Sequence, residues 1–575
     1  MRRGARRRSS AGRGPSTARR STAGRSTTGL AAGIAGAAAL IALVNVASRL
    51  VGFGRWLAML NQVGNESVGN AYSSANALPN ILFEIVAGGA LAGAVVPLVA
   101  VPLARSLRAD VDRTASALLG WALAVLTPVA VLVAVASRPL VAVVMVRRSA
   151  DEIDLAATFL TAFAAQIPLY GIGVVLTGVL QAQRRFLAAA VAPLLNSLVV
   201  IAVFFAFGAQ VQGARDDPTA LSAGSVALLG WGTTAGVAVM SLPLLWPVHR
   251  SGVRLRPTLR FPDGVAGRAR ALALAGLGAL VAQQVSTLAA VWTANAHGGN
   301  GTYPVFLSTQ AVYYLPYAVL AFPLATAALP RLAERAATGD GHGFAALTAR
   351  TTRTLVLVSA LGAGVLVAVA PAVEDLFDVV ARGDVTGMST GLTWMAPGLI
   401  GFALILHLSR ALYSLHRGRS AVLATAAGWL AVAGVAVAGI PLLTSGARDQ
   451  VATLAGLGLA TTIGMTIAGA GLLVAIGRAA GAATVAGLPR TGAVVVAGSV
   501  LGAAAGRLVT DLTTADGIGR ALGAGALGAL TCMVVLLATA WAGDRGALRA
   551  LAEPRGGGAA RPGSGPPPEE TTSVG

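Results

Sequence analysis

Lysine is absent from the sequence: all 43 basic residues among 575 are arginines. This excludes a nucleotide-binding phosphate loop, whose lysine reaches the phosphates, and a lysine Schiff base. The single cysteine, Cys532, cannot form an intrachain disulfide. The histidines lack the spacing of metal ligands: His249, His297, His342, His407 and His416. We therefore expect no metal, no cofactor and no enzymatic chemistry.

Charged residues are also scarce. They form 11% of the chain, whereas 55% of it is hydrophobic and the mean hydropathy is +0.72. Soluble domains contain about 25% charged residues, so the composition predicts an all-α polytopic membrane protein. The net charge of +20 would suit nucleic acid, but the arginines gather in a few segments between apolar runs. That distribution indicates membrane topology, and we expect no nucleic-acid partner.

Fourteen apolar stretches approach the length of about 20 residues that a transmembrane helix needs. With the N-terminus inside, the inner segments hold 32 arginines and the outer loops eight. This bias places both termini in the cytoplasm of a protein in the cytoplasmic membrane. The predicted spans are 35–60, 71–103, 115–136, 155–181, 187–208, 222–247, 271–296, 304–329, 354–379, 390–415, 421–443, 451–476, 491–510 and 521–542.

The loop pattern divides the chain into two lobes. A cytoplasmic linker, 251–270, separates an N-terminal lobe of six helices from a C-terminal lobe of six more, and together with Arg250 just before it this linker holds six arginines. Two additional helices follow, and both ends are low in complexity, so we expect disordered cytoplasmic tails. The predicted units are 1–28 (basic tail), 29–250, 251–270, 271–480, 481–545 (helices thirteen and fourteen) and 546–575 (Pro/Gly-rich tail).

A repeated motif supports the two lobes. The segment LAGAVVP at 91–97 returns as LATAALP at 324–330, displaced by 233 residues. The segment LQAQRR at 180–185 has a weaker counterpart in LYSLHR at 412–417, displaced by 232. Each pair is six spans apart, an even number, so the repeats are parallel rather than inverted.

The candidate site lies in the first two spans. Arg49 and Arg55 interrupt an apolar run, and ionised groups at membrane depth usually face a cavity or a partner. Either arginine could instead reach an interface or pair with Glu84, which could also take part in an ion-linked step. We expect Asn76 and Asn80 to line the cavity, although such amides often only join neighbouring helices. Helix breaks are predicted at four prolines: Pro79, Pro97, Pro316 and Pro330.

These segments also carry a resemblance. SRLVGFGR (48–55), ALPN (77–80) and GALAGAVVPLVA (89–100) are similar to the opening of the MurJ/MviN family of lipid II flippases. Two later stretches, 178–201 and 312–334, resemble the family's fourth-to-fifth-helix segment and its eighth helix. The family belongs to the multidrug/oligosaccharidyl-lipid/polysaccharide exporter superfamily. Its members enclose a cavity between two six-helix lobes, and helices thirteen and fourteen add a groove for the lipid tail.

The resemblance implies a flippase that moves lipid II, a polyprenyl-pyrophosphate-linked glycan, by alternating access. Membrane lipids and cell-wall synthesis proteins are the other partners it implies. Several family charges are replaced: acidic residues by Asn70 and Gly88, paired arginines by Phe83 and Glu84, and an eighth-helix arginine by Ala311. These departures leave open a flippase for another polyprenyl-linked glycan, a drug or metabolite exporter on the same fold, and a scaffold that has lost transport.

Overall fold

The computed structural model describes residues 24–86, 92–211, 217–275, 277–381, 383–513 and 517–546, and these residues contain helices but no strands. The N-terminal lobe contains α1 (Gly24–Gln62), α2 (Ser67–Phe83), α3 (Ala92–Ala104), α4 (Arg108–Val135), α5 (Ser137–Val144), α6 (Ala150–Ala164), α7 (Gln166–Ala182), α8 (Phe186–Val211), the 3₁₀ turn η2 (Pro218–Ala220), α9 (Ala223–Ser241), the turn η3 (Leu242–Leu244) and α10 (Leu245–Arg250).

The second lobe follows the same plan, and the last two helices pack on its α15. It contains α11 (Val265–Ala275), α12 (Leu277–His297), α13 (Thr302–Pro316), the π turn η4 (Tyr317–Ala321), α14 (Phe322–Ala337), α15 (Gly341–Val380), α16 (Met388–Met395), α17 (Gly398–Ser414), α18 (Gly418–Leu443), α19 (Gln450–Ala480), the 3₁₀ turn η5 (Ala482–Val485), α20 (Leu488–Thr513) and α21 (Ile518–Gly543).

The described residues contain 11 helices that are long and apolar enough to cross a membrane, or 12 if the bent pair α16–α17 is one span. This confirms a multi-pass helical membrane protein, while the exact number of fourteen stays a prediction. The predicted spans outside this count, 35–60 and 71–103, correspond to α1 and to α2 with α3. Residues 87–91 between α2 and α3 lie outside the described residues.

Some predicted boundaries differ from the helices. α1 begins at Gly24, inside the segment 1–28 that was predicted to be a disordered tail, and residues 1–23 lie outside the described residues. α11 begins at Val265, inside the predicted linker 251–270. The predicted tail 546–575 lies outside the described residues except for its first residue.

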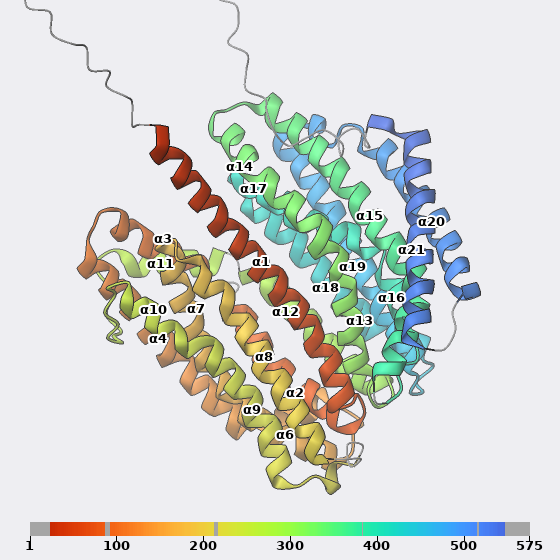
Figure 1. Cartoon of the computed structure of the whole chain (residues 1–575). Coiled ribbons are helices and arrows are strands. Elements are labelled where there is room, and N and C mark those ends of the chain that lie inside the picture. The colour runs from red at the N-terminus through yellow and green to blue at the C-terminus, as the bar shows by residue number, and fades with distance from the viewer. Residues whose placement is uncertain are drawn as a thin grey trace, which may run out of the picture.

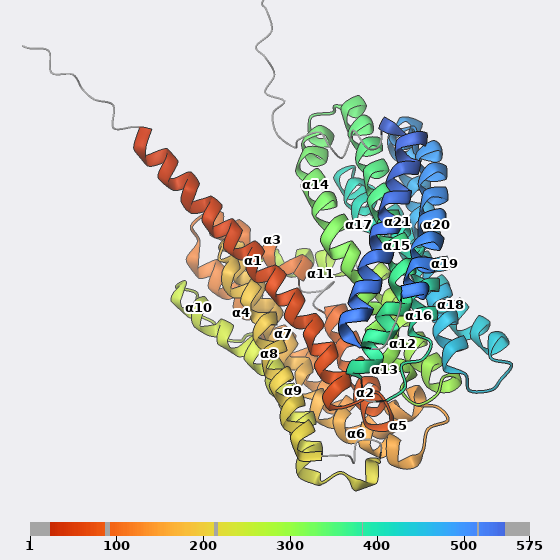
Figure 2. The ribbon, with the colours of Figure 1, turned by 45° about the vertical axis from the view of Figure 1, so that its right-hand side comes forward.

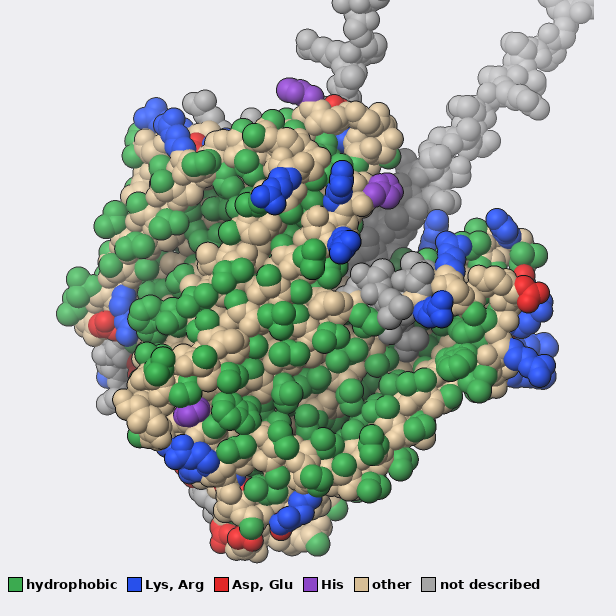
Figure 3. Space-filling view, turned by 180° about the vertical axis from the view of Figure 1, so that it is seen from behind, with side chains coloured by type: hydrophobic (Ala, Val, Ile, Leu, Met, Phe, Trp, Pro, Cys, Tyr) green, Lys and Arg blue, Asp and Glu red, His purple; other side chains and the backbone are tan. Residues whose placement is uncertain are grey.

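The two lobes diverge toward the end where α1 begins and α21 ends, and they meet at the opposite end (Figures 1 and 2). We call these the open end and the closed end. The space-filling view from behind shows a notch between the lobes at the open end, and arginines at the tip of each lobe there (Figure 3). The molecule therefore holds a cleft that is accessible from the end where α1 begins and α21 ends.

The backbone repeats the predicted internal displacement. Glu84 begins a short π-helical segment, and η4 begins at Tyr317, 233 residues later. Arg184 and His416, 232 residues apart, both adopt the left-handed conformation, with φ of 60° and 57°. Non-glycine residues rarely adopt that conformation. This coincidence supports two lobes related by a parallel repeat.

The four prolines behave differently from one another. A break occurs at Pro316, the last residue of α13, where η4 follows. Pro79 lies inside α2, and the interruption begins five residues later at Glu84. The predicted breaks at Pro97 and Pro330 are wrong, because α3 and α14 continue through them. A proline removes one donor and frees one carbonyl, and neighbouring groups can satisfy that carbonyl within a membrane helix.

Candidate functional site in the cleft between the lobes

Arg49 and Arg55 enter the cleft from α1. The side chain of Arg49 is exposed, and its guanidinium carbon lies 5.6 Å from the ring centre of Phe322 on the opposite lobe. Arg55, one and a half turns further along, is half-buried and lies 5.9 Å from the ring centre of Trp56. Arg49 is thus a cation positioned between the two lobes.

Glu84 and Asn80 reach the same space from the end of α2. Both side chains are exposed, and Asn80 accepts a hydrogen bond of 3.2 Å from the Tyr170 hydroxyl of α7. Tyr170 lies within electrostatic range of Arg55 and Glu84. This tyrosine therefore connects three of the predicted site residues.

The second lobe contributes two tyrosines and an arginine that the sequence analysis did not select. Tyr314 of α13 lies within electrostatic range of Glu84. Tyr317, at the start of η4, lies within range of Arg49 and of Arg410 of α17. Arg410 is an arginine in a predicted span, so the reasoning that selected Arg49 applies to it equally. The predicted break at Pro316 would have led to Tyr317.

The charged residues predicted for the site do not form ion pairs with one another among the described residues. Among the described residues, neither Arg49 nor Arg55 forms an ion pair with Glu84. Asn76, one turn before Asn80, is half-buried, and its Oδ1 has no hydrogen-bond partner there. The described residues also contain no cluster of three or more metal-ligating side chains. The cleft therefore presents separate cations, a carboxylate, an amide and aromatic rings rather than a closed ion-pair network.

The closed end is held by one buried arginine. Arg148, in the loop before α6, is 9% exposed, and its hydrogen bonds run to neutral groups of the opposite lobe. Its Nε donates to Asn295 Oδ1 over 3.2 Å, one terminal nitrogen donates to the Gly299 carbonyl over 2.8 Å, and the other donates to Asn300 Oδ1. Burial lowers the pKa of the Arg148 guanidinium to about 10, and nearby Glu152 opposes that shift.

Amides extend this contact between the lobes. Asn70 of α2 donates to Asn295 Oδ1 over 2.8 Å, and Asn295 in turn donates to Ser74 over 3.1 Å. Asn61 and Asn65 donate to the carbonyls of Val380 and Asp384 over 2.8 and 2.6 Å. Asn70, which replaces an acidic residue of the family pattern, is thus part of the closed end.

Comparison with known proteins identifies the family. The family model described as lipid II flippase MurJ matches residues 59–519. The probable lipid II flippases MurJ of Rhizobium meliloti (strain 1021) and Rhizobium tropici are each 26% identical, over 362 and 299 residues. These alignments cover 62% and 51% of this chain, and 65% and 54% of the relatives. The chain thus spans a little under two thirds, and about half, of the relatives it matches.

Solved structures show the same fold. A lipid II flippase MurJ in an inward closed conformation superposes with a TM-score of 0.69 at 15% identity, covering 88% of this chain and 99% of that chain. An inward-facing multidrug resistance transporter of the MATE family superposes with a TM-score of 0.62 at 14% identity, covering 76% and 98%. An outward-facing MATE structure gives 0.53 at 15% identity, covering 76% and 93%. Since the family model matches most of its length, this chain belongs to the lipid II flippase MurJ family.

Proposed function

We propose that the protein translocates lipid II across the cytoplasmic membrane by alternating access. The observation that carries this proposal is the convergence of Arg49, Arg55 and Arg410 with Glu84 on one cleft between the lobes of a MurJ-family fold. Guanidinium groups suit a pyrophosphate because they offer planar paired donors and stay charged. The headgroup would enter this cleft while the polyprenyl tail stays in lipid.

The interrupted helices support a change between two states. Glu84 and Tyr317, the cleft residues of α2 and η4, both stand where a helix passes into a π segment. Such segments often mark functional sites in helices. The closed end consists largely of side-chain amides and backbone carbonyls, and water can replace these partners when the lobes separate. The cleft would then open at the opposite end and release the headgroup there.

The replacement of several family charges supports a second candidate substrate, another polyprenyl-linked glycan. Phe83 packs against the Tyr170 ring, with centroids 4.3 Å apart, and so fills part of the cleft wall where the family carries an arginine. Fewer cations favour a polyprenyl-linked glycan with less anionic charge than lipid II. This second candidate uses the same cleft and the same mechanism.

Transport can be measured with the purified protein in liposomes. We expect movement of fluorescent lipid II to the opposite leaflet at a rate well above that of protein-free liposomes. Loading the liposomes with another polyprenyl-pyrophosphate-linked sugar tests the second candidate. Absence of transport for both lipids, together with failure to sustain a flippase-depleted bacterium, would contradict the proposed function. It would leave a scaffold for cell-wall synthesis proteins as the better explanation.

We further propose that the open end faces the cytoplasm, on the basis of the arginine bias and of the start of α1 and the end of α21 lying at that end. Cysteines at two exposed alanines test this: Ala220 in η2 at the closed end and Ala266 in α11 on the other side. Cys532 is buried and can stay. An impermeant thiol reagent outside intact cells should label only the cysteine at position 220. Labelling of position 266 alone would reverse the orientation.

A further inference from the structure

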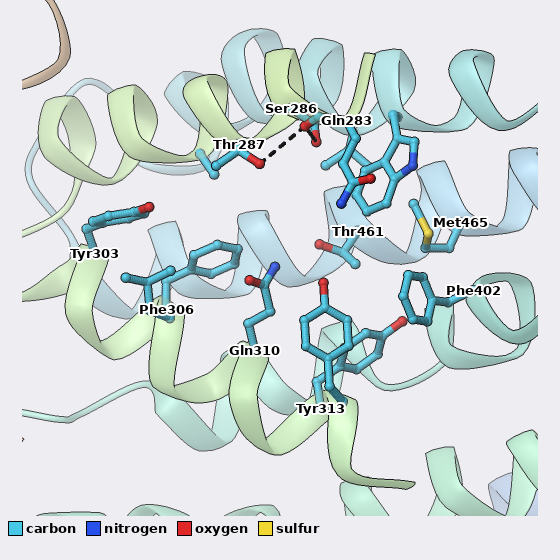
Figure 4. Close-up of a pocket in the computed structure, with 15 residues that line it drawn as sticks. Gln283, Ser286, Thr287, Tyr303, Phe306, Gln310, Tyr313, Phe402, Thr461 and Met465 are labelled. Atoms are coloured by element: carbon cyan, nitrogen blue, oxygen red, sulfur yellow. Dashed lines mark hydrogen bonds between the residues drawn. The ribbon is translucent and has the colours of Figure 1, made fainter. Parts of the chain in front are cut away.

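A small chamber lies inside the second lobe, between α12, α13, α17, α18 and α19. Its volume is about 100 Å³. Gln283 descends from α12, and Gln310 and Tyr313 rise from α13 toward the same space, with Thr461 of α19 behind them (Figure 4). No arginine, histidine or carboxylate lines it.

The polar groups of the chamber have unused hydrogen-bonding capacity. The amides of Gln283 and Gln310 form no hydrogen bond with any described residue, although each can both donate and accept. Tyr313 is 1% exposed, and its hydroxyl has no partner among the described residues. Leaving a buried polar group without a partner costs about 1–3 kcal/mol, so the position of the Tyr313 hydroxyl is unfavourable unless something else uses it, whereas the two glutamines are half-buried.

An aromatic wall separates the chamber from the charged cleft. Tyr314 and Phe402 line the chamber with ring centres 5.3 Å apart, and Phe402 lies 4.7 Å from the ring centre of Tyr317. Tyr314 is also the residue within range of Glu84, and Tyr317 is within range of Arg49. A headgroup held in the cleft therefore lies against the outer side of this wall. Tyr317 belongs to the π segment η4, so the wall stands on a helix feature that often marks functional sites.

The polar lining of the chamber is not repeated at the corresponding place in the N-terminal lobe. The residue 233 positions before Gln310 is Ala77, and the N-terminal lobe near it is filled by aromatic packing of Tyr72 against Phe159, Phe163 and Phe204. The N-terminal lobe does hold a cavity, next to Phe83 and Tyr170, but its lining is mostly apolar. Among the described residues, aromatic rings thus fill the part of the N-terminal lobe where the second lobe has the amides of the chamber.

The lining selects the chemical class of a ligand. A cation would use the amide and hydroxyl oxygens but leave the amide N–H groups unpaired, and an anion would do the reverse. An uncharged amide satisfies both, because it carries one acceptor and at least one donor. Water molecules can place their centres over about 100 Å³ of the chamber, which is room for several waters and for an acetamido or carboxamide group.

We propose that the chamber is a specificity subsite that receives an uncharged amide substituent, such as the acetamido group of a lipid-linked amino sugar, while the cleft holds the pyrophosphate. This inference rests on the proposed function. Gln283 and Gln310 pair with the amide, Tyr313 donates or accepts the remaining hydrogen bond, and the aromatic rings cover the methyl group.

The test compares two lipids that differ in one substituent. Polyprenyl-pyrophosphate-linked N-acetylglucosamine and its glucose counterpart are titrated against the protein in lipid nanodiscs. We expect the wild type to bind the acetylated lipid about tenfold more tightly, the effect of about one to two buried hydrogen bonds. Gln310→Met and Gln283→Met, which keep the side-chain volume, should bring that ratio close to one without weakening the binding of the glucose lipid.

Tyr313→Phe separates binding from folding. It removes a buried hydroxyl that has no protein partner, so it should not lower the melting temperature, yet it should reduce the preference. Tyr72→Phe is the matched control, because Tyr72 is buried in the other lobe and its hydroxyl bonds Thr233 over 3.0 Å. That control should lower stability and keep the preference.

Equal affinity of the wild type for the two lipids, or a preference that survives both glutamine variants, would overturn the subsite while leaving the flippase assignment intact. A preference that appears only with added sodium would make the chamber a cation site and also overturn it. Binding of neither lipid would contradict the proposed function itself, and the subsite with it.

Discussion

The two ends of the cleft use polar groups in opposite ways. At the closed end, Arg148 is 9% exposed and shares its donors among amide and carbonyl oxygens of the other lobe. Toward the open end, Arg49 and Glu84 are exposed and form no ion pair with each other. The contact between lobes thus uses neutral acceptors for its one buried cation, whereas the charges in the cleft are left separate.

This difference fits a protein that must change state. A hydrogen bond contributes about 0.5–1.5 kcal/mol net between neutral groups and about 1.5–3 kcal/mol when one group is charged, because water replaces the partner when the contact opens. A carboxylate facing Arg148 at the same depth would make separation of the lobes far more costly, since breaking a buried ion pair costs about 3–5 kcal/mol. Neutral acceptors therefore keep the closed end closed without making it permanent.

The largest expected effect comes from removing the cation in the cleft. Arg49→Ala should lower lipid II transport about a hundredfold, because up to two hydrogen bonds to a charged group, each worth about 1.5–3 kcal/mol, are lost. Membrane abundance should stay near normal, since Arg49 is exposed and has no ion pair with Glu84. Arg49→Lys should recover transport only in part, because it restores the charge but not the paired planar donors.

The double variant Arg49→Ala/Glu84→Ala is the control for this first prediction. If Arg49 served mainly to neutralise Glu84, the single variant would accumulate poorly and the double variant would regain both abundance and transport. Membrane level and transport rate of the three proteins, measured side by side, decide between ligand binding and structural pairing.

A smaller effect is expected at the closed end. Arg148→Met keeps an unbranched side chain but removes three donated hydrogen bonds, so the population with separated lobes should rise at least about tenfold. Spin labels on cysteines at Ala220 and Ala447, exposed residues of opposite lobes, would report this as a longer distance by pulsed electron resonance.

Arg138→Met is the matched control for the closed end. Arg138 is also an arginine near this end, but its partner Asp154, 2.6 Å away, belongs to the same lobe. Its removal should leave the distance distribution unchanged. Equal broadening in both variants would mean that loss of surface charge, rather than the contact between lobes, controls the opening.

Sequence reasoning predicted the fold well because apolar length and loop charge are local signals. The two lobes followed from them, the repeat followed from two pairs of similar motifs, and the backbone reproduces the displacement of 232 residues at Arg184 and His416. The helix breaks were predicted less well. Pro97 shows that a proline alone does not determine whether a membrane helix continues, because the surrounding helices decide whether the freed carbonyl finds a donor.

The candidate site was predicted only on one side. Arg49, Arg55, Asn80 and Glu84 lie in one stretch of sequence, so a single motif revealed them. Their partners across the cleft come from α13, η4 and α17, more than 200 residues away, and no local pattern connects them to α1. Arg148 lies between the predicted spans 115–136 and 155–181, and nothing in the sequence shows that Asn295 and Asn300 would bury it.

The smallest expected effect tests the carboxylate of the cleft. Glu84→Gln should change transport by no more than about threefold and leave abundance unchanged, because the exposed side chain forms no ion pair and glutamine keeps a hydrogen-bonding oxygen. Asn80, one turn earlier, keeps its bond to Tyr170 in this variant and preserves the cleft wall.

Transport should be measured with and without an imposed proton gradient. If Glu84→Gln abolished the response to the gradient while Asn80→Ala did not, the carboxylate would carry the coupling ion. The cleft would then couple transport to the proton gradient as well as bind the headgroup. In that case the change of state would not be controlled by the closed end alone.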